Sequence, residues 1–173
     1  MNKKTDAFND KKIMVPFVVP TINSNDKNQI LKALSSNLLT DGPNLREFEK
    51  NFQNYTRSKF STGVSNATAG LMLSLKALGI SKNDEVIIPD ITFVATANAV
   101  LSCNATPVLS DVNYEDLNIS IDSIEENITK KTRAIIPVHF AGKSCDMKQI
   151  MKIAKKHDLK IVEDCAHAIG TLY

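Results

Sequence analysis

From residue 62 onward, short apolar runs alternate with longer amphipathic stretches. The runs EVII, AIIPV and IVE are continuously apolar or nearly so, which is typical of strands buried on both faces. Repeated alternation of strand and helix predicts α/β layers, with helices flanking a mostly parallel sheet. The expected strands are residues 62–64, 85–88, 106–109, 134–138 and 160–163, and the expected helices between them are 67–78, 92–103, 121–127 and 147–157.

The N-terminal part follows a different pattern. We expect a flexible tail over residues 1–14, followed by a single domain over residues 15–173. Apolar positions at helical spacing predict helices over 25–36 and 45–55, and Thr-Asp-Gly-Pro-Asn at 40–44 predicts a turn between them. The apolar stretch MVPFVVP contains prolines and is too short for a signal sequence or a membrane span.

Composition narrows the class of partner. With 173 residues, 43% of them hydrophobic and 23% charged, the chain can bury a sizeable core. A net charge of +2, with both signs interspersed, predicts no nucleic-acid or membrane partner and favours a small molecule. The three cysteines lack the spacing of a disulfide framework or a metal site and suit a reducing cytoplasm.

Ligands of parallel sheets bind beyond the carboxyl ends of the strands, so the residues that follow each strand are the first candidates. Ser65-Asn66-Ala67-Thr68-Ala69-Gly70 follows one expected strand and opens a helix. Free backbone N–H groups, the helix dipole and nearby hydroxyls could bind a phosphate there. The alternative is that these polar residues only cap the helix.

Two further loops carry candidate chemistry. Phe93, after the EVII strand, could stack on a heteroaromatic ring, although core packing is the common role of phenylalanine. Asp164 ends the last strand, and a carboxylate beside a pyridine nitrogen keeps that nitrogen protonated. His167 could contact the phenolic oxygen of the same ring. Both polar residues could instead serve only the local structure.

Other residues at this edge suggest less. His139 follows AIIPV and is expected to shape the pocket. Cys165 has no neighbouring base in the sequence, so we expect a small buried side chain rather than a nucleophile. The chain has no GxGxxG loop after a strand, which argues against a Rossmann dehydrogenase.

Taken in order, five segments resemble the DegT/StrS-type family of nucleotide-sugar aminotransferases. They are SNATAGLMLSLKALGI, DEVIIPDITFVATANAV, ATPVLSDV, TKKTRAIIPVHFAG and IVEDCAHAIGTLY, and TDGPN followed by EFEKNF fits as well. The resemblance implies the large domain of a fold-type I pyridoxal-phosphate transferase, truncated before the small C-terminal domain, and a homodimer that completes each active site.

The resemblance also implies site residues. Thr68 and Ala69 would bind the phosphate of pyridoxal 5'-phosphate, and Phe93 would stack on its ring. Asp164 would pair with the pyridine nitrogen, and His167, where many relatives have Gln, would lie near the phenolic oxygen. The turn at 40–44 would lie near the sugar or the dimer contact.

The sequence departs from the family in one respect. Relatives continue beyond the equivalent of Tyr173 to the lysine that forms the Schiff base with the cofactor, and no lysine of this chain matches that motif. The implied reaction is amino transfer, with glutamate as the expected donor, to a nucleotide-linked keto sugar for polysaccharide precursors. The alternatives are an inactive fragment, a half-enzyme completed by a separate C-terminal piece, a non-enzymatic regulatory or dimerising module, and sugar dehydration on the same scaffold.

Overall fold

The computed structural model of the chain describes residues 19–173, so the tail expected over residues 1–14 lies outside the described residues. The chain divides into two compact units within one helix, the first ending at Lys50 and the second beginning at Asn51. Among the described residues, no helix combines the length and the apolar character needed to cross a membrane.

The first unit contains α1 (Ser24–Leu34) and the beginning of α2 (Pro43–Thr56). Asn23 and Asp26 form a reciprocal capping box that fixes the start of α1. The turn expected at residues 40–44 lies between the two helices only in part, because Pro43 and Asn44 already belong to α2. It borders a groove of about 260 Å³ that Leu34, Leu38 and Gly42 help to line.

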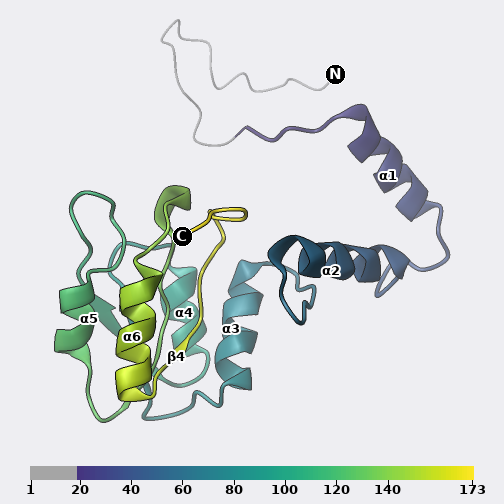
Figure 1. Ribbon diagram of the computed structural model, residues 1–173. Coiled ribbons are helices and arrows are strands. Elements are labelled where there is room, and N and C mark those ends of the chain that lie inside the picture. The colour runs from purple at the N-terminus through teal and green to yellow at the C-terminus, as the bar shows by residue number, and fades with distance from the viewer. Residues whose placement is uncertain (1–18) are drawn as a thin grey trace, which may run out of the picture. The chain divides into compact units, whose positions relative to one another are not determined.

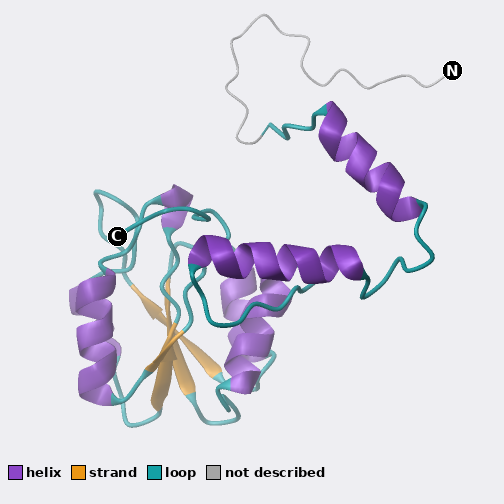
Figure 2. Cartoon of the chain, turned by 45° about the vertical axis from the view of Figure 1, so that its right-hand side comes forward, coloured by secondary structure: helices purple, strands orange, loops and turns teal. Residues whose placement is uncertain are grey.

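The second unit is built on four parallel strands in the order β2-β1-β3-β4. Figure 2 shows these strands between helices. The strands are β1 (Glu85–Pro89), β2 (Thr106–Ser110), β3 (Thr132–Ile135) and β4 (Lys160–Ile161), and the helices are α3 (Ala67–Ala77), α4 (Ala95–Leu101), α5 (Ile121–Asn127) and α6 (Met147–His157), with a short 3₁₀ turn, η1 (Phe140–Gly142). The predicted α/β class and parallel sheet are confirmed.

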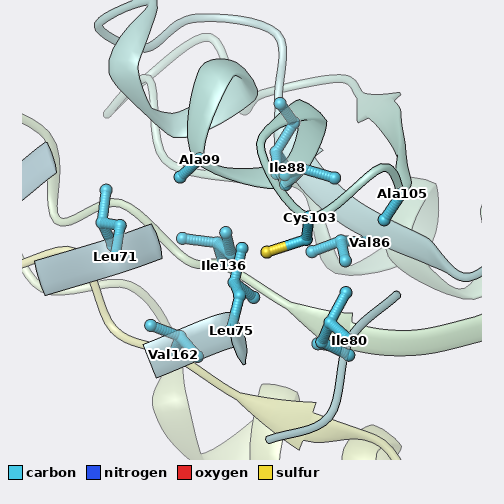
Figure 3. Packing of buried hydrophobic residues seen from close by; sticks show 12 residues of the cluster. Leu71, Leu75, Ile80, Val86, Ile88, Ala99, Cys103, Ala105, Ile136 and Val162 are labelled. Carbon is cyan, nitrogen blue, oxygen red and sulfur yellow. The ribbon is translucent and has the colours of Figure 1, made fainter. Parts of the chain in front are cut away.

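Side chains alternate between two cores along the central strands. Val86 and Ile88 of β1 join a cluster with α3 and α4, part of which Figure 3 shows. Ile87, between them, joins a second cluster with α5 and α6. Residues 86–88 of β1 and 134–136 at the end of β3 are buried on both faces of the sheet and are continuously apolar, and the unit has three layers (Figure 1).

The strand order reverses between β1 and β3. The chain passes from β1 outward to β2, then returns across β1 to β3 and continues to β4. Parallel sheets bind ligands at the carboxyl ends of strands where such a reversal occurs. The loops that follow β1, β3 and β4 therefore surround the position expected for a ligand.

Several expected boundaries were wrong. Residues 62–64 form no strand, because in the described part of the chain no strand pairs with them. The expected strands at 134–138 and 160–163 end early, since Pro137 has no N–H to continue the ladder. The parallel pairing resumes beyond it as a single bridge between Val138 and Asp164. The helix expected from residue 92 begins at Ala95.

Candidate functional site

Asp164 lies at the carboxyl edge of the sheet and is buried, with 9% of its surface exposed. Its N–H donates to the Pro137 carbonyl at 2.9 Å, and its own carbonyl accepts the His139 N–H at 3.2 Å. Both hydrogen bonds extend the β3–β4 pairing past the strands themselves. The backbone of Asp164 is therefore fixed by the sheet, and its side chain starts from a defined position.

Both carboxylate oxygens of Asp164 have protein donors. Oδ1 accepts the Ala166 N–H at 3.1 Å, and Oδ2 accepts the Thr96 hydroxyl at 3.3 Å. A buried carboxylate is costly unless it is hydrogen-bonded, and these donors stabilise it in place. Each oxygen retains a second lone pair, so a cationic N–H of a ligand could still bind.

Phe93 lies in the loop between β1 and α4, with 76% of its surface exposed. It takes no part in the apolar core, so the common role of phenylalanine does not apply here. Its carbonyl accepts the Thr96 N–H at 3.0 Å, which joins it to the residue that contacts Asp164. An exposed aromatic ring in the loop that also leads to the donor of a buried carboxylate suits a flat heteroaromatic ligand.

Thr68 and Ala69 occupy the first turn of α3, and Thr68 is exposed. The other end of α3 leads into the amino end of β1, so this first turn lies towards the carboxyl edge of the sheet (Figure 1). The Ala69 N–H donates to Asn66 Oδ1 at 2.9 Å. Asn66 therefore caps α3, as in the alternative interpretation of this segment. A phosphate would bind the other free N–H groups of the first turn or displace the Asn66 side chain.

His167 is exposed and lies three residues after Asp164. The segment that contains it packs on η1, since Thr171 Oγ1 donates to the Gly142 carbonyl at 2.7 Å. Gly142 has a φ of +86°, and a Cβ there would lie 3.1 Å from the His167 carbonyl oxygen. The loops after β3 and β4 are therefore held together at the same edge.

His139 is buried and supports this edge from below the surface. Its Nδ1 accepts the Cys145 N–H at 3.1 Å, so the neutral ring carries its proton on Nε2 and donates it to Glu163 at 3.0 Å. Donor atoms of His139, Glu163 and Cys165 lie within 4.8 Å of one another. A metal ion could bind Nε2 only if this nitrogen lost its proton. The observed hydrogen bonds therefore favour a structural role for His139.

Cys165 is exposed, which contradicts the buried position expected from the sequence, because the chain turns outward directly after Asp164. Partial burial and, to a lesser extent, the negative charges of Glu163 and Asp164 together raise the pKa of its thiol to about 11. The thiol is therefore protonated at neutral pH and is a poor nucleophile.

Alkylation of Cys165 should consequently be slow. At pH 8 a thiol with a pKa of about 11 has on the order of 100-fold less thiolate than one at the ordinary value of 9.0. We expect iodoacetamide to react with Cys165 more slowly than with N-acetylcysteine by about that factor, and the rate to increase with pH up to about 11. Peptide mass spectrometry, with Cys165→Ser as the control, measures this rate. Reaction as fast as the free thiol at pH 8 would contradict the expectation.

Sequence reasoning missed Thr96, whose hydroxyl donates to Asp164. It is fully buried and pairs with Thr92, four residues earlier in the loop before α4. The available signal was a pair of threonines four residues apart beside the Phe93 motif, but no local pattern connects Thr96 with a residue 68 positions later.

Comparison with known proteins establishes the family of the chain. Residues 20–173 match the DegT/DnrJ/EryC1/StrS aminotransferase family. The chain belongs to this family. This match confirms the family and the fold-type I architecture that were predicted from the sequence.

Three similar proteins illustrate the relationship. The spore coat polysaccharide biosynthesis protein SpsC of Bacillus subtilis is 40% identical over 92% of the chain and 41% of its own length. The GDP-perosamine synthase of Escherichia coli O157:H7 is 39% identical over 92% of the chain and 44% of its own length. The solved structure of NtdA from Bacillus subtilis, with bound cofactor PMP, is 38% identical with a TM-score of 0.83, over 94% of this chain and 39% of that one. The chain thus spans about 40% of the length of the relatives it matches.

Proposed function

We propose that the protein carrying this chain is a pyridoxal-phosphate-dependent aminotransferase that transfers an amino group from glutamate to a keto group of a nucleotide-linked sugar. The observation that carries the proposal is the buried Asp164 carboxylate at the carboxyl edge of the sheet, held at both oxygens by protein donors. Family membership supports the reaction, and the names of two relatives support a role in polysaccharide precursors.

The residues of this chain would divide the work of binding. Asp164 would accept a hydrogen bond from the ring nitrogen, and its negative charge would keep that nitrogen protonated. Phe93 would cover one face of the ring, and Thr68 and Ala69 would bind the phosphate at the start of α3. His167 would lie beside the phenolic oxygen. Bound pyridoxal phosphate would supply the electron sink for the reaction.

Further parts of the proposal concern partners. We propose a homodimer, because α1 exposes the apolar side chains of Ile30, Leu31 and Leu34. We propose that the turn at residues 40–44 contacts the sugar or the second subunit. The three free cysteines fit a cytoplasmic protein.

A second candidate function concerns the polypeptide of these 173 residues alone. It has no lysine in the family's motif, so it would bind the cofactor reversibly and would need a separate C-terminal piece for catalysis. This candidate concerns only these residues, which align with about 40% of each relative.

One experiment tests both candidates. The 173-residue polypeptide is mixed with pyridoxal phosphate, treated with borohydride and mapped by mass spectrometry, and the natural full-length product is assayed with glutamate and nucleotide-linked keto sugars. We expect no adduct at a single lysine in the former and amino-sugar formation with the latter. A specific adduct or turnover by the 173-residue polypeptide would overturn the second candidate. Absence of amino-sugar formation by a full-length product that binds the cofactor would overturn the first.

A further inference from the structure

Thr96 has a buried hydroxyl between two polar partners. The residue is fully buried in the first turn of α4. Its Oγ1 lies 2.9 Å from Thr92 Oγ1 and 3.3 Å from Asp164 Oδ2. A buried hydroxyl without partners would cost stability, so this arrangement holds Thr96 in one rotamer. The hydroxyl joins the start of α4 to the end of the β4 segment.

The chemistry of the three groups fixes the direction of these hydrogen bonds. An ionised carboxylate can only accept, so the single proton of Thr96 must point to Asp164. The oxygen of Thr96 then has lone pairs but no proton for Thr92, so Thr92 must be the donor to it. The order is Thr92 to Thr96 to Asp164, and successive donors of this kind polarise one another.

The two donors together restrict the carboxylate. The Ala166 N–H holds Oδ1 through the loop that follows Asp164, and Thr96 holds Oδ2 through a different helix. Rotation of the carboxylate about its Cβ–Cγ bond would break both hydrogen bonds. The plane of the group is therefore set by two separate elements, and its free lone pairs have a fixed direction.

We propose that Thr96, supported by Thr92, is a positioning residue that orients the Asp164 carboxylate towards the protonated nitrogen of a heteroaromatic ligand. This inference rests on the proposed function, because that ligand is the cofactor ring. Thr96 acts through Asp164 and does not touch the ligand. Its contribution therefore depends on a nitrogen being present in the ring.

The test compares two ligands on the 173-residue polypeptide. Pyridoxamine phosphate binds without a lysine, and its 1-deaza analogue has C–H in place of the ring nitrogen. Thr96→Val removes the hydroxyl with little change of shape, and Thr96→Ser keeps the hydroxyl and removes the methyl group. Dissociation constants are measured by isothermal titration calorimetry.

We expect Thr96→Val to weaken the binding of pyridoxamine phosphate about tenfold, which corresponds to one net hydrogen bond. The dissociation constant of the deaza analogue should change by less than about twofold. Thr96→Ser should bind pyridoxamine phosphate like the wild type. Thr92→Val, which removes only the upstream donor, should weaken it by a smaller factor of about two to three. If Thr96→Val fails to fold, Thr92→Val still tests the same chain of hydrogen bonds.

The outcomes separate the inference from the proposed function. Equal losses for both ligands, or no loss with pyridoxamine phosphate in both valine variants, would overturn the positioning role of Thr96. If the wild type binds the two ligands equally, or if Asp164→Ala does not weaken pyridoxamine phosphate, the proposed cofactor site fails and the inference fails with it. Loss in Asp164→Ala without loss in Thr96→Val refutes the inference alone.

Discussion

Asp164→Ala is expected to weaken the binding of pyridoxamine phosphate by between about 10-fold and 100-fold. A hydrogen bond that involves a charged group contributes about 1.5 to 3 kcal/mol, and 1.4 kcal/mol corresponds to a factor of ten. The carboxylate is buried and held on both oxygens, so its removal takes away an acceptor of fixed position. Calorimetric titration of the 173-residue polypeptide measures the loss.

Asp90→Ala is the matched control for this substitution. Asp90 follows β1 at the same edge of the sheet, but it is exposed. Removing it changes the net charge by the same amount, and charges in water interact weakly with a ligand. We expect less than a twofold change in affinity. Similar losses in the two variants would show that general charge, rather than the position of Asp164, determines binding.

Ile150→Ala should produce the largest loss of stability among simple core truncations of α6. Ile150 is fully buried in the cluster that α5 and α6 form against the sheet. Truncation of a buried isoleucine costs about 2 to 5 kcal/mol, because the lost transfer free energy adds to that of the cavity left behind. Urea unfolding of the 173-residue polypeptide, followed by circular dichroism, measures the free energy of unfolding.

The neighbouring residue provides the comparison. Met151 lies on the same helix with 48% of its surface exposed, so Met151→Ala should change the free energy of unfolding by less than about 0.5 kcal/mol. Both substitutions place alanine in the same helix, so they differ mainly in burial. Comparable losses would mean that α6 does not pack as the structure describes.

Local signals in the sequence were sufficient for several elements. The predicted helices at 121–127 and 147–157 coincide with α5 and α6, because Ser120 and Asp146 cap their first turns. The parallel sheet followed from continuous apolar runs, since burial on both faces leaves no polar alternation. These properties depend on residues close in the sequence, and such residues can be read directly.

Other features depend on distant partners. Residues 62–64 have the composition of a strand, but a strand exists only where another one hydrogen-bonds to it. The contact between Thr96 and Asp164 joins residues 68 positions apart, so no local pattern could predict it. The outward turn at Cys165 likewise follows from the packing of the loop after β4. The roles of Thr68, Ala69, Phe93, Asp164 and His167 in cofactor binding stay predictions.

The hydrogen bond from Ala69 to Asn66 has a consequence for how the site is loaded. The Asn66 amide oxygen accepts a hydrogen bond at a place where an anion could bind, and this bond holds the first turn of α3 in its helical form. An incoming phosphate that took this place would exchange one acceptor for another and would not have to order the backbone. The affinity for the phosphate would then not be reduced by the cost of ordering the backbone. The Asn66 side chain would move aside as the phosphate bound.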